Sequence, residues 1–186
     1  SEVLKLNVKI IGIDLKKEVI EHCNNISKKL NFNNLSFIYG DVIDYENKDE
    51  IDMVISLHAC NTATDIAILK ALGWNAKVFF AVPCCQKEIN SQLGNEFLPF
   101  MLKHGIIKEK FSTLLTDSIR SEVLEAFGYK SDIVEFISEE NTPKNQLIRA
   151  YKTSTKLDKE KIKQIEKFTS SLNIKMFLLD EVAKLI

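Results

Sequence analysis

Residues 51–65 read I-D-M-V-I-S-L-H-A-C-N-T-A-T-D, an apolar run that turns at once into a cluster of polar side chains. Residues 77–88, K-V-F-F-A-V-P-C-C-Q-K-E, repeat this arrangement further along the chain. Each apolar run is typical of a buried strand. In an open parallel sheet, ligands bind beyond the carboxyl ends of the strands, where side chains and backbone N–H groups converge. The two polar loops therefore predict one active site, and with it an enzyme.

Strands and helices alternate on both sides of these loops. The apolar and helical spacings predict strands over 8–14, 35–39, 51–57, 77–82, 131–137 and 145–151, and helices over 17–30, 62–72, 88–103, 113–127, 156–170 and 175–186. This alternation, closed by a strand pair, favours an α/β doubly wound sheet with right-handed crossovers between the early strands. We expect residues 1–152 to form this domain and residues 153–186 to form a C-terminal helical appendage or a pair of covering helices.

Composition narrows the class of protein. A chain of 186 residues suits one domain. A net charge of −1 gives no electrostatic basis for general nucleic-acid binding, although it leaves room for a local basic patch. No apolar run reaches the roughly 18 residues of a membrane span. Two of the four cysteines, Cys84 and Cys85, are adjacent, which is a poor geometry for a disulfide, so a reducing cytoplasm fits best.

Two acids follow the first two predicted strands. Asp14 ends G-I-D-L, where a carboxylate can accept hydrogen bonds from the ribose hydroxyls of a nucleotide-like cofactor. The alternative is that Asp14 caps the following helix. Asp41, after Gly40, can place its carboxylate or the neighbouring backbone near an adenine amino group, and the alternative is a simple turn.

The loop after residue 57 carries a histidine. His58 is a candidate for proton transfer, because the unperturbed histidine side chain has a pKa near 6.5, whereas the alternative is a packed structural histidine. Asn61 or Thr62 would cap the next helix, with Asp65 in its first turn complementing the helix dipole. That structural interpretation accounts for part of the loop but not for His58.

The segment P-C-C-Q, residues 83–86, has three interpretations. Metal ligation together with His58 and Cys60 is one, but the paired cysteine spacing of structural zinc sites is absent. A nucleophilic cysteine, as in the P-C-Q of cytosine-5 methyltransferases, is the second, although that motif normally follows an earlier strand. In the third, which we favour, the small cysteines shape a tight pocket and Gln86 hydrogen-bonds a ligand. We therefore predict no metal site.

The six glycines contain no G-x-G or G-x-x-G pattern, which the phosphate- or cofactor-binding loop of such folds normally carries. We expect the first strand and its glycine loop to lie before Val8, outside this chain. The neighbouring strands would then expose an edge, which is a template for association. We expect this edge to be rearranged, covered by the C-terminal helices, or used in a homodimer.

The order G-I-D-L, G-D, L-H-A-C-N-T-A-T-D, V-P-C-C-Q-K-E, L-L-T-D-S-I-R, G-Y-K, E-F-I and T-P-K-N resembles a family of class I S-adenosylmethionine-dependent methyltransferases over about residues 8–150. Its relatives include eukaryotic methyltransferase-like proteins and, more distantly, tRNA 2′-O-methyltransferases. The resemblance implies a seven-stranded Rossmann-like sheet whose last strand is antiparallel and inserted next to the sixth. This chain differs from the family in two places: the glycine motif is missing, and Asn61 stands where most relatives have Asp.

The resemblance also implies roles for individual residues. The cofactor S-adenosylmethionine would contact Asp14, Asp41, Val42, Leu57 and His58. His58 would accept a proton, while Asn61 and Gln86 would orient the methyl acceptor. The substrate side would include Cys60, Thr64, Asp65, Pro83, Cys84, Cys85, Lys144 and Asn145. RNA is the first expected acceptor, ahead of protein or a small molecule. The alternatives are a cofactor-less binding module of this fold and a Cys/His metal or redox site.

Overall fold

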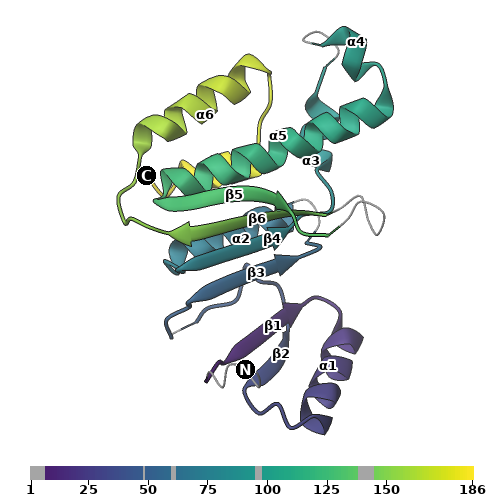
Figure 1. Cartoon of the computed structure of the whole chain (residues 1–186), viewed down its shortest axis with the longest axis vertical. Helices are drawn as coiled ribbons and strands as arrows, with labels where there is room; N and C mark the ends of the chain where they lie inside the picture. The colour runs from purple at the N-terminus through teal and green to yellow at the C-terminus, as the bar shows by residue number, and fades with distance from the viewer. Residues whose placement is uncertain (1–6, 48, 60–61, 95–97, 138–144) are drawn as a thin grey trace. The chain divides into compact units, whose positions relative to one another are not determined.

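The computed structural model of the chain describes residues 7–47, 49–59, 62–94, 98–137 and 145–186 (Figure 1). It divides into two compact units, Ser1–Lys48 and Asp49–Ile186, and each is described by itself.

The first unit is a strand–helix–strand crossover. It contains β1 (Ile10–Asp14), α1 (Lys17–Lys29) and β2 (Leu35–Tyr39), and the two strands pair in parallel. The side chain of Asn24 in α1 makes two hydrogen bonds to the backbone of Phe37 in β2: its Nδ2 donates to the carbonyl, and its Oδ1 accepts from the amide. Ile10 of β1 is 51% exposed.

The second unit contains a four-stranded mixed sheet. Its strands are β3 (Met53–Leu57), β4 (Val78–Val82), β5 (Tyr129–Glu135) and β6 (Gln146–Lys152), in the order β3-β4-β6-β5. The pair β3–β4 is parallel, whereas β6 lies between β4 and β5 and is antiparallel to both, as Figure 1 shows. The prediction of an α/β fold whose last strand is antiparallel is confirmed.

Helices cover this sheet: α2 (Thr62–Gly73), α3 (Lys87–Gln92), α4 (Pro99–Leu102), α5 (Gly105–Ala126), α6 (Lys159–Ser171) and α7 (Phe177–Val182). One hydrophobic core joins strand residues such as Phe79 and Ile148 to Val123 of α5. The C-terminal helices belong to the same core, through Ile162 of α6 and Leu178 of α7. Among the described helices, none has the length and apolarity needed to cross a membrane.

β3 and β5 are the outer strands of the four-stranded sheet. Three apolar side chains of β3 are exposed, with Met53 at 46%, Ile55 at 57% and Leu57 at 65%. An outer strand with exposed apolar side chains is a template for pairing with another chain. Association through a sheet edge therefore remains a prediction for this strand.

Candidate active site

In the first unit, two carboxylates lie at the carboxyl ends of β1 and β2. The amide of Gly40 donates to the carbonyl of Asp14 at 3.2 Å, which places the start of the Gly40–Asp41 turn beside the end of β1. Asp14 does not cap α1, because the N-cap position is Lys16, whose amide donates to Asp14 Oδ1 at 2.8 Å. Asp41 Oδ1 similarly accepts from the amide of Ile43 at 3.0 Å. Each carboxylate thus shapes its own loop with one oxygen, and the exposed Asp14 keeps a second acceptor for a ligand.

In the second unit, His58 follows β3 in a left-handed conformation, with φ of 52°. This conformation is uncommon for a residue other than glycine, and such residues cluster at functional sites. The amide of His58 donates to the carbonyl of Val82 at 3.0 Å, and the Cys84 thiol donates to the carbonyl of His58 at 3.5 Å. The side chain of His58 is exposed, which argues against a packed structural histidine. The loops after β3 and β4 are therefore bonded to each other.

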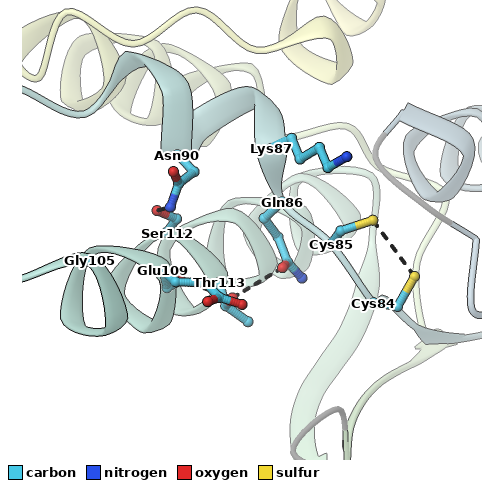
Figure 2. Close-up of a pocket in the computed structure, with 9 residues that line it drawn as sticks. All are labelled: Cys84, Cys85, Gln86, Lys87, Asn90, Gly105, Glu109, Ser112 and Thr113. Carbon is cyan, nitrogen blue, oxygen red and sulfur yellow. Dashed lines mark hydrogen bonds between the residues drawn. The ribbon is translucent and has the colours of Figure 1, made fainter.

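A pocket opens beside the second loop. Its volume is about 360 Å³, at the lower end of the range for small-molecule sites. One wall comes from the P-C-C-Q segment and α3 and the other from the first half of α5, as Figure 2 shows. The residues that line it are Cys84, Cys85, Gln86, Lys87, Asn90, Gly105, Glu109, Ser112 and Thr113. This lining offers amide, hydroxyl and thiol groups together with the charged side chains of Lys87 and Glu109.

Gln86 and Asn90 are held within the pocket by the hydroxyls of α5. The hydroxyl of Thr113 donates to Gln86 Oε1 at 3.0 Å, and Asn90 Nδ2 donates to the hydroxyl of Ser112 at 3.0 Å. Cys84 and Cys85 remain thiols, with their sulfur atoms 3.8 Å apart (Figure 2). Across the part of the chain that the structure describes, no three metal-ligating side chains converge. The pocket interpretation of P-C-C-Q stays a prediction.

A buried ion network lies behind Gln86. Arg120 of α5 donates through Nε to Asp65 Oδ1 at 2.7 Å and through Nη1 to Asp117 Oδ1 at 2.9 Å. All three side chains are almost completely buried. Burial raises the pKa of Asp65 and of Asp117, and the Arg120 guanidinium opposes that rise. The second oxygen of Asp65, Oδ2, has no hydrogen-bond partner among the described residues.

Some residues predicted for the substrate side face the interior. Asp65 is fully buried in the ion network, and the hydroxyl of Thr64 donates to the carbonyl of Ala59 at 2.8 Å. Asn145 is also buried, and its Nδ2 donates to the carbonyl of Ile137 at 3.0 Å. Pro83 is buried after β4. Cys60, Asn61 and Lys144 lie outside the described residues.

The sequence did not predict the α5 wall of the pocket. It also did not predict that Arg120 of α5 is buried between two carboxylates. The sequence pattern that could have indicated this wall is a set of polar residues at four-residue spacing, Glu109, Thr113 and Asp117, which lie on one face of α5. Its meaning depended on knowing that this face meets the P-C-C-Q segment.

Comparison with known proteins agrees with the fold. Residues 1–92 match the family described as "Methyltransferase domain". The structure is similar to an rRNA methylase from Streptococcus thermophilus, with a TM-score of 0.51 and 14% identity, covering 78% of this chain and 74% of that one. It is also similar to a protein assigned as an rRNA methylase from Clostridium thermocellum, with a TM-score of 0.52 and 15% identity, covering 78% and 73%. No curated protein matches.

The family match spans both polar loops, because it contains His58 and the P-C-C-Q segment and ends at residue 92. The similar structures share the Rossmann-like fold of methyltransferases, so that fold is confirmed. The first half of the chain therefore resembles a methyltransferase domain in sequence, and the chain shares its fold with the two methylases.

Proposed function

We propose that this chain carries the catalytic portion of a cytoplasmic methyltransferase that transfers a methyl group from S-adenosylmethionine to RNA. The observation that carries the proposal is the pair of bonded loops after β3 and β4. They place the His58 backbone against Cys84, next to a polar pocket, in a domain that matches a methyltransferase family. Active sites of open α/β sheets form at such strand ends.

The cofactor supplies an electrophilic methyl group on a sulfonium ion. In this chain Asp14 would bind its ribose hydroxyls with the carboxylate oxygen that does not hold Lys16. Asp41 and Val42 would lie near the adenine, and Leu57 would supply apolar surface, since its side chain is 65% exposed. A carboxylate that accepts ribose hydroxyls at the end of a strand is a recurrent feature of nucleotide-binding sheets. The two carboxylates of the first unit therefore fit the cofactor.

His58 is the proposed proton acceptor, because its side chain is exposed at the loop after β3 and histidine is the side chain that most often transfers protons in catalysis. Gln86 would orient the acceptor group from inside the pocket, and Asn61, which lies outside the described residues, would assist it. Positioning the acceptor against the cofactor supplies much of the rate enhancement in a displacement of this kind. Cys84 and Cys85 would border the acceptor without reacting.

RNA is proposed as the acceptor on two grounds. The two similar structures described above are both named as rRNA methylases. The pocket also presents amide and hydroxyl groups, which suit the hydrogen-bonding edges of an unstacked base. With a net charge of −1, the chain would depend on this local recognition more than on general attraction to phosphates.

The proposal is tested by calorimetric titration of S-adenosylmethionine and S-adenosylhomocysteine into this chain and into the longest reading frame that contains it. The same titration of the Asp14→Ala variant tests the proposed ribose contact. Asp44→Ala is its matched control, because Asp44 is an exposed acid that the proposal gives no role. Methyl transfer is then followed with labelled cofactor and total RNA, protein or small-molecule fractions. Label in RNA supports the proposal, and label confined to protein contradicts the acceptor. Absence of cofactor binding by either protein would instead favour a docking module of this fold.

A further inference from the structure

Three separate stretches of the sequence meet in one buried cluster. Asp65 ends the stretch 51–65, Gln86 ends P-C-C-Q, and Asp117 with Arg120 comes from L-L-T-D-S-I-R. Arg120 joins Asp65 to Asp117, and Gln86 Nε2 lies 3.4 Å from Asp117 Oδ2. The cluster therefore reaches the pocket at Gln86.

We propose that Asp117, held by Arg120, is a positioning residue that fixes the side-chain amide of Gln86 in a single orientation. Gln86 would then be the residue that selects the acceptor by its pattern of hydrogen-bond donor and acceptor. The second statement rests on the proposed function, whereas the first concerns only the geometry of the pocket.

The orientation follows from what each group can do. A carboxylate only accepts hydrogen bonds, so the atom of Gln86 that faces Asp117 must be the donor Nε2. Oε1 then turns to Thr113, whose hydroxyl donates to it at 3.0 Å, as Figure 2 shows. Gln86 retains one N–H and one lone pair for a ligand. The pocket thus presents a donor and an acceptor in a fixed order.

Arg120 prevents Asp117 from turning. The guanidinium is 1% exposed and is bonded on two sides, to Asp117 and to Asp65 in the first turn of α2. Burial raises the pKa of Asp117, so keeping a charged carboxylate at this position carries an energetic cost. A neutral Asn at position 117 would reduce that cost, but it could no longer accept hydrogen bonds from both Arg120 and Gln86.

Asp117→Asn is therefore expected to invert Gln86. If Asn Oδ1 keeps the bond to Arg120, Asn Nδ2 faces Gln86, and only Gln86 Oε1 can accept from it. The hydroxyl of Thr113 can turn its proton to the carbonyl of Glu109, which lies 3.1 Å away, and accept from Gln86 Nε2. The flipped amide again has one hydrogen bond at each end, so the remaining donor and acceptor that face the pocket exchange places.

Side-chain amide NMR can test this orientation without any activity. The chain has four glutamines, at positions 86, 92, 146 and 164, so protein labelled with ¹⁵N-glutamine gives four NH₂ pairs. Gln86→Met identifies the pair of interest by its disappearance. We expect Asp117→Asn to shift the Gln86 pair and to leave the other three in place. Asp65→Asn is the matched control, because Asp65 shares Arg120 but makes no described contact with Gln86, and it should leave all four pairs in place.

An unshifted Gln86 pair in Asp117→Asn, or equal shifts in Asp117→Asn and Asp65→Asn, would overturn the positioning role. If Asp117→Asn does not fold, Thr113→Val replaces it. Losing the hydroxyl should shift the Gln86 pair while Asp117 and Arg120 remain paired, and an unshifted pair would again overturn the proposal.

Methyl transfer to total RNA tests the consequence for selection. We expect Asp117→Asn to lower kcat/KM for RNA roughly 10- to 100-fold, because a reversed amide leaves polar groups of the ligand unpaired, with KM for S-adenosylmethionine unchanged. Full RNA methylation by a variant with a shifted Gln86 pair would overturn the selective role. If the wild-type protein methylates no RNA, the acceptor proposal fails, and the NMR result still decides the orientation of Gln86.

Discussion

Replacing Arg120 by Met removes a guanidinium that two buried carboxylates share. The side chain is 1% exposed, and its nitrogens lie 2.7 Å from Asp65 and 2.9 Å from Asp117. Methionine occupies much of the same volume but leaves both carboxylates buried without their counter-charge. Removing one partner of a buried ion pair typically costs about 3–5 kcal/mol. We expect a loss of free energy of unfolding of this size at neutral pH.

The loss should shrink as the pH falls. Burial raises the pKa of Asp65 and of Asp117, and the Arg120 guanidinium opposes this effect, so without it both folded-state pKa values rise further. A carboxyl whose folded pKa is raised contributes its full stability below the unfolded pKa, about 3.9 for aspartate, and loses it as the pH rises through the folded pKa. The variant should therefore come closest to the wild type near pH 4.

Urea unfolding followed by the fluorescence of Trp74 measures this loss. Trp74 is the one tryptophan of the chain and lies directly after α2, so its signal reports the unit that contains Arg120. The free energy of unfolding is compared between wild type and Arg120→Met across about pH 4 to 8 by linear extrapolation.

Two further variants separate the buried charge from other effects. Adding Asp65→Asn and Asp117→Asn to Arg120→Met should recover much of the stability at pH 7, because no uncompensated charge remains. Arg149→Met should cost at most about 1 kcal/mol, since Arg149 is 42% exposed and lies 3.6 Å from the exposed Asp132. The reasoning is refuted by an Arg120→Met loss below about 1 kcal/mol, or by one that does not change with pH.

Four other outcomes are expected. His58→Ala should lower turnover in a methyl-transfer assay roughly 10²- to 10⁴-fold, and a full-rate variant would remove His58 from the proton-accepting role. Asp14→Ala should weaken S-adenosylhomocysteine binding roughly 10- to 100-fold by calorimetry, because charged hydrogen bonds to the ribose are lost, and unchanged affinity would contradict that contact. The buried Tyr129 donates to the carbonyl of Ala76 at 2.6 Å, and burial raises the pKa of Tyr129 to about 12. The buried neutral phenol contributes its full stability below the unfolded pKa of tyrosine, about 10, and this contribution is lost as the pH rises through the folded pKa. Tyr129→Phe should therefore flatten the alkaline fall in melting temperature. Ile55→Lys, on the outer strand β3, should reduce self-association in sedimentation velocity, and unchanged association would exclude that edge.

The sequence predicted strands more closely than helices. β2 coincides with its predicted range, Leu35–Tyr39, and β4 ends at Val82 as expected because Pro83 cannot continue the ladder. The helix predicted over 88–103 is instead two short helices, α3 and α4, and the second begins at Pro99. Proline is favoured at the first position of a helix, so Pro99 was a start signal inside a continuous helical spacing.

The pocket could be predicted only on one side. Cys84, Cys85 and Gln86 are neighbours in sequence at the end of a strand, so their convergence followed from the general geometry of α/β sheets. Ser112 and Thr113 come from a helix that the sequence placed too late, since α5 begins at Gly105. The pairing of that helix with α3 depends on tertiary packing, which no local spacing encodes.

The polar stretch that decided the fold divides into an outer and an inner part. His58 faces outward at the end of β3, whereas Thr64 and Asp65 lie in the first turn of α2 and face the core. Residue type alone could not separate them, because a buried carboxylate is tolerated only where a partner is supplied, and the partner Arg120 lies 55 positions further along the chain. The same motif thus serves two tasks. Substitution of Asp65 should act first on stability, while substitution of His58 should act on the reaction and leave stability nearly unchanged.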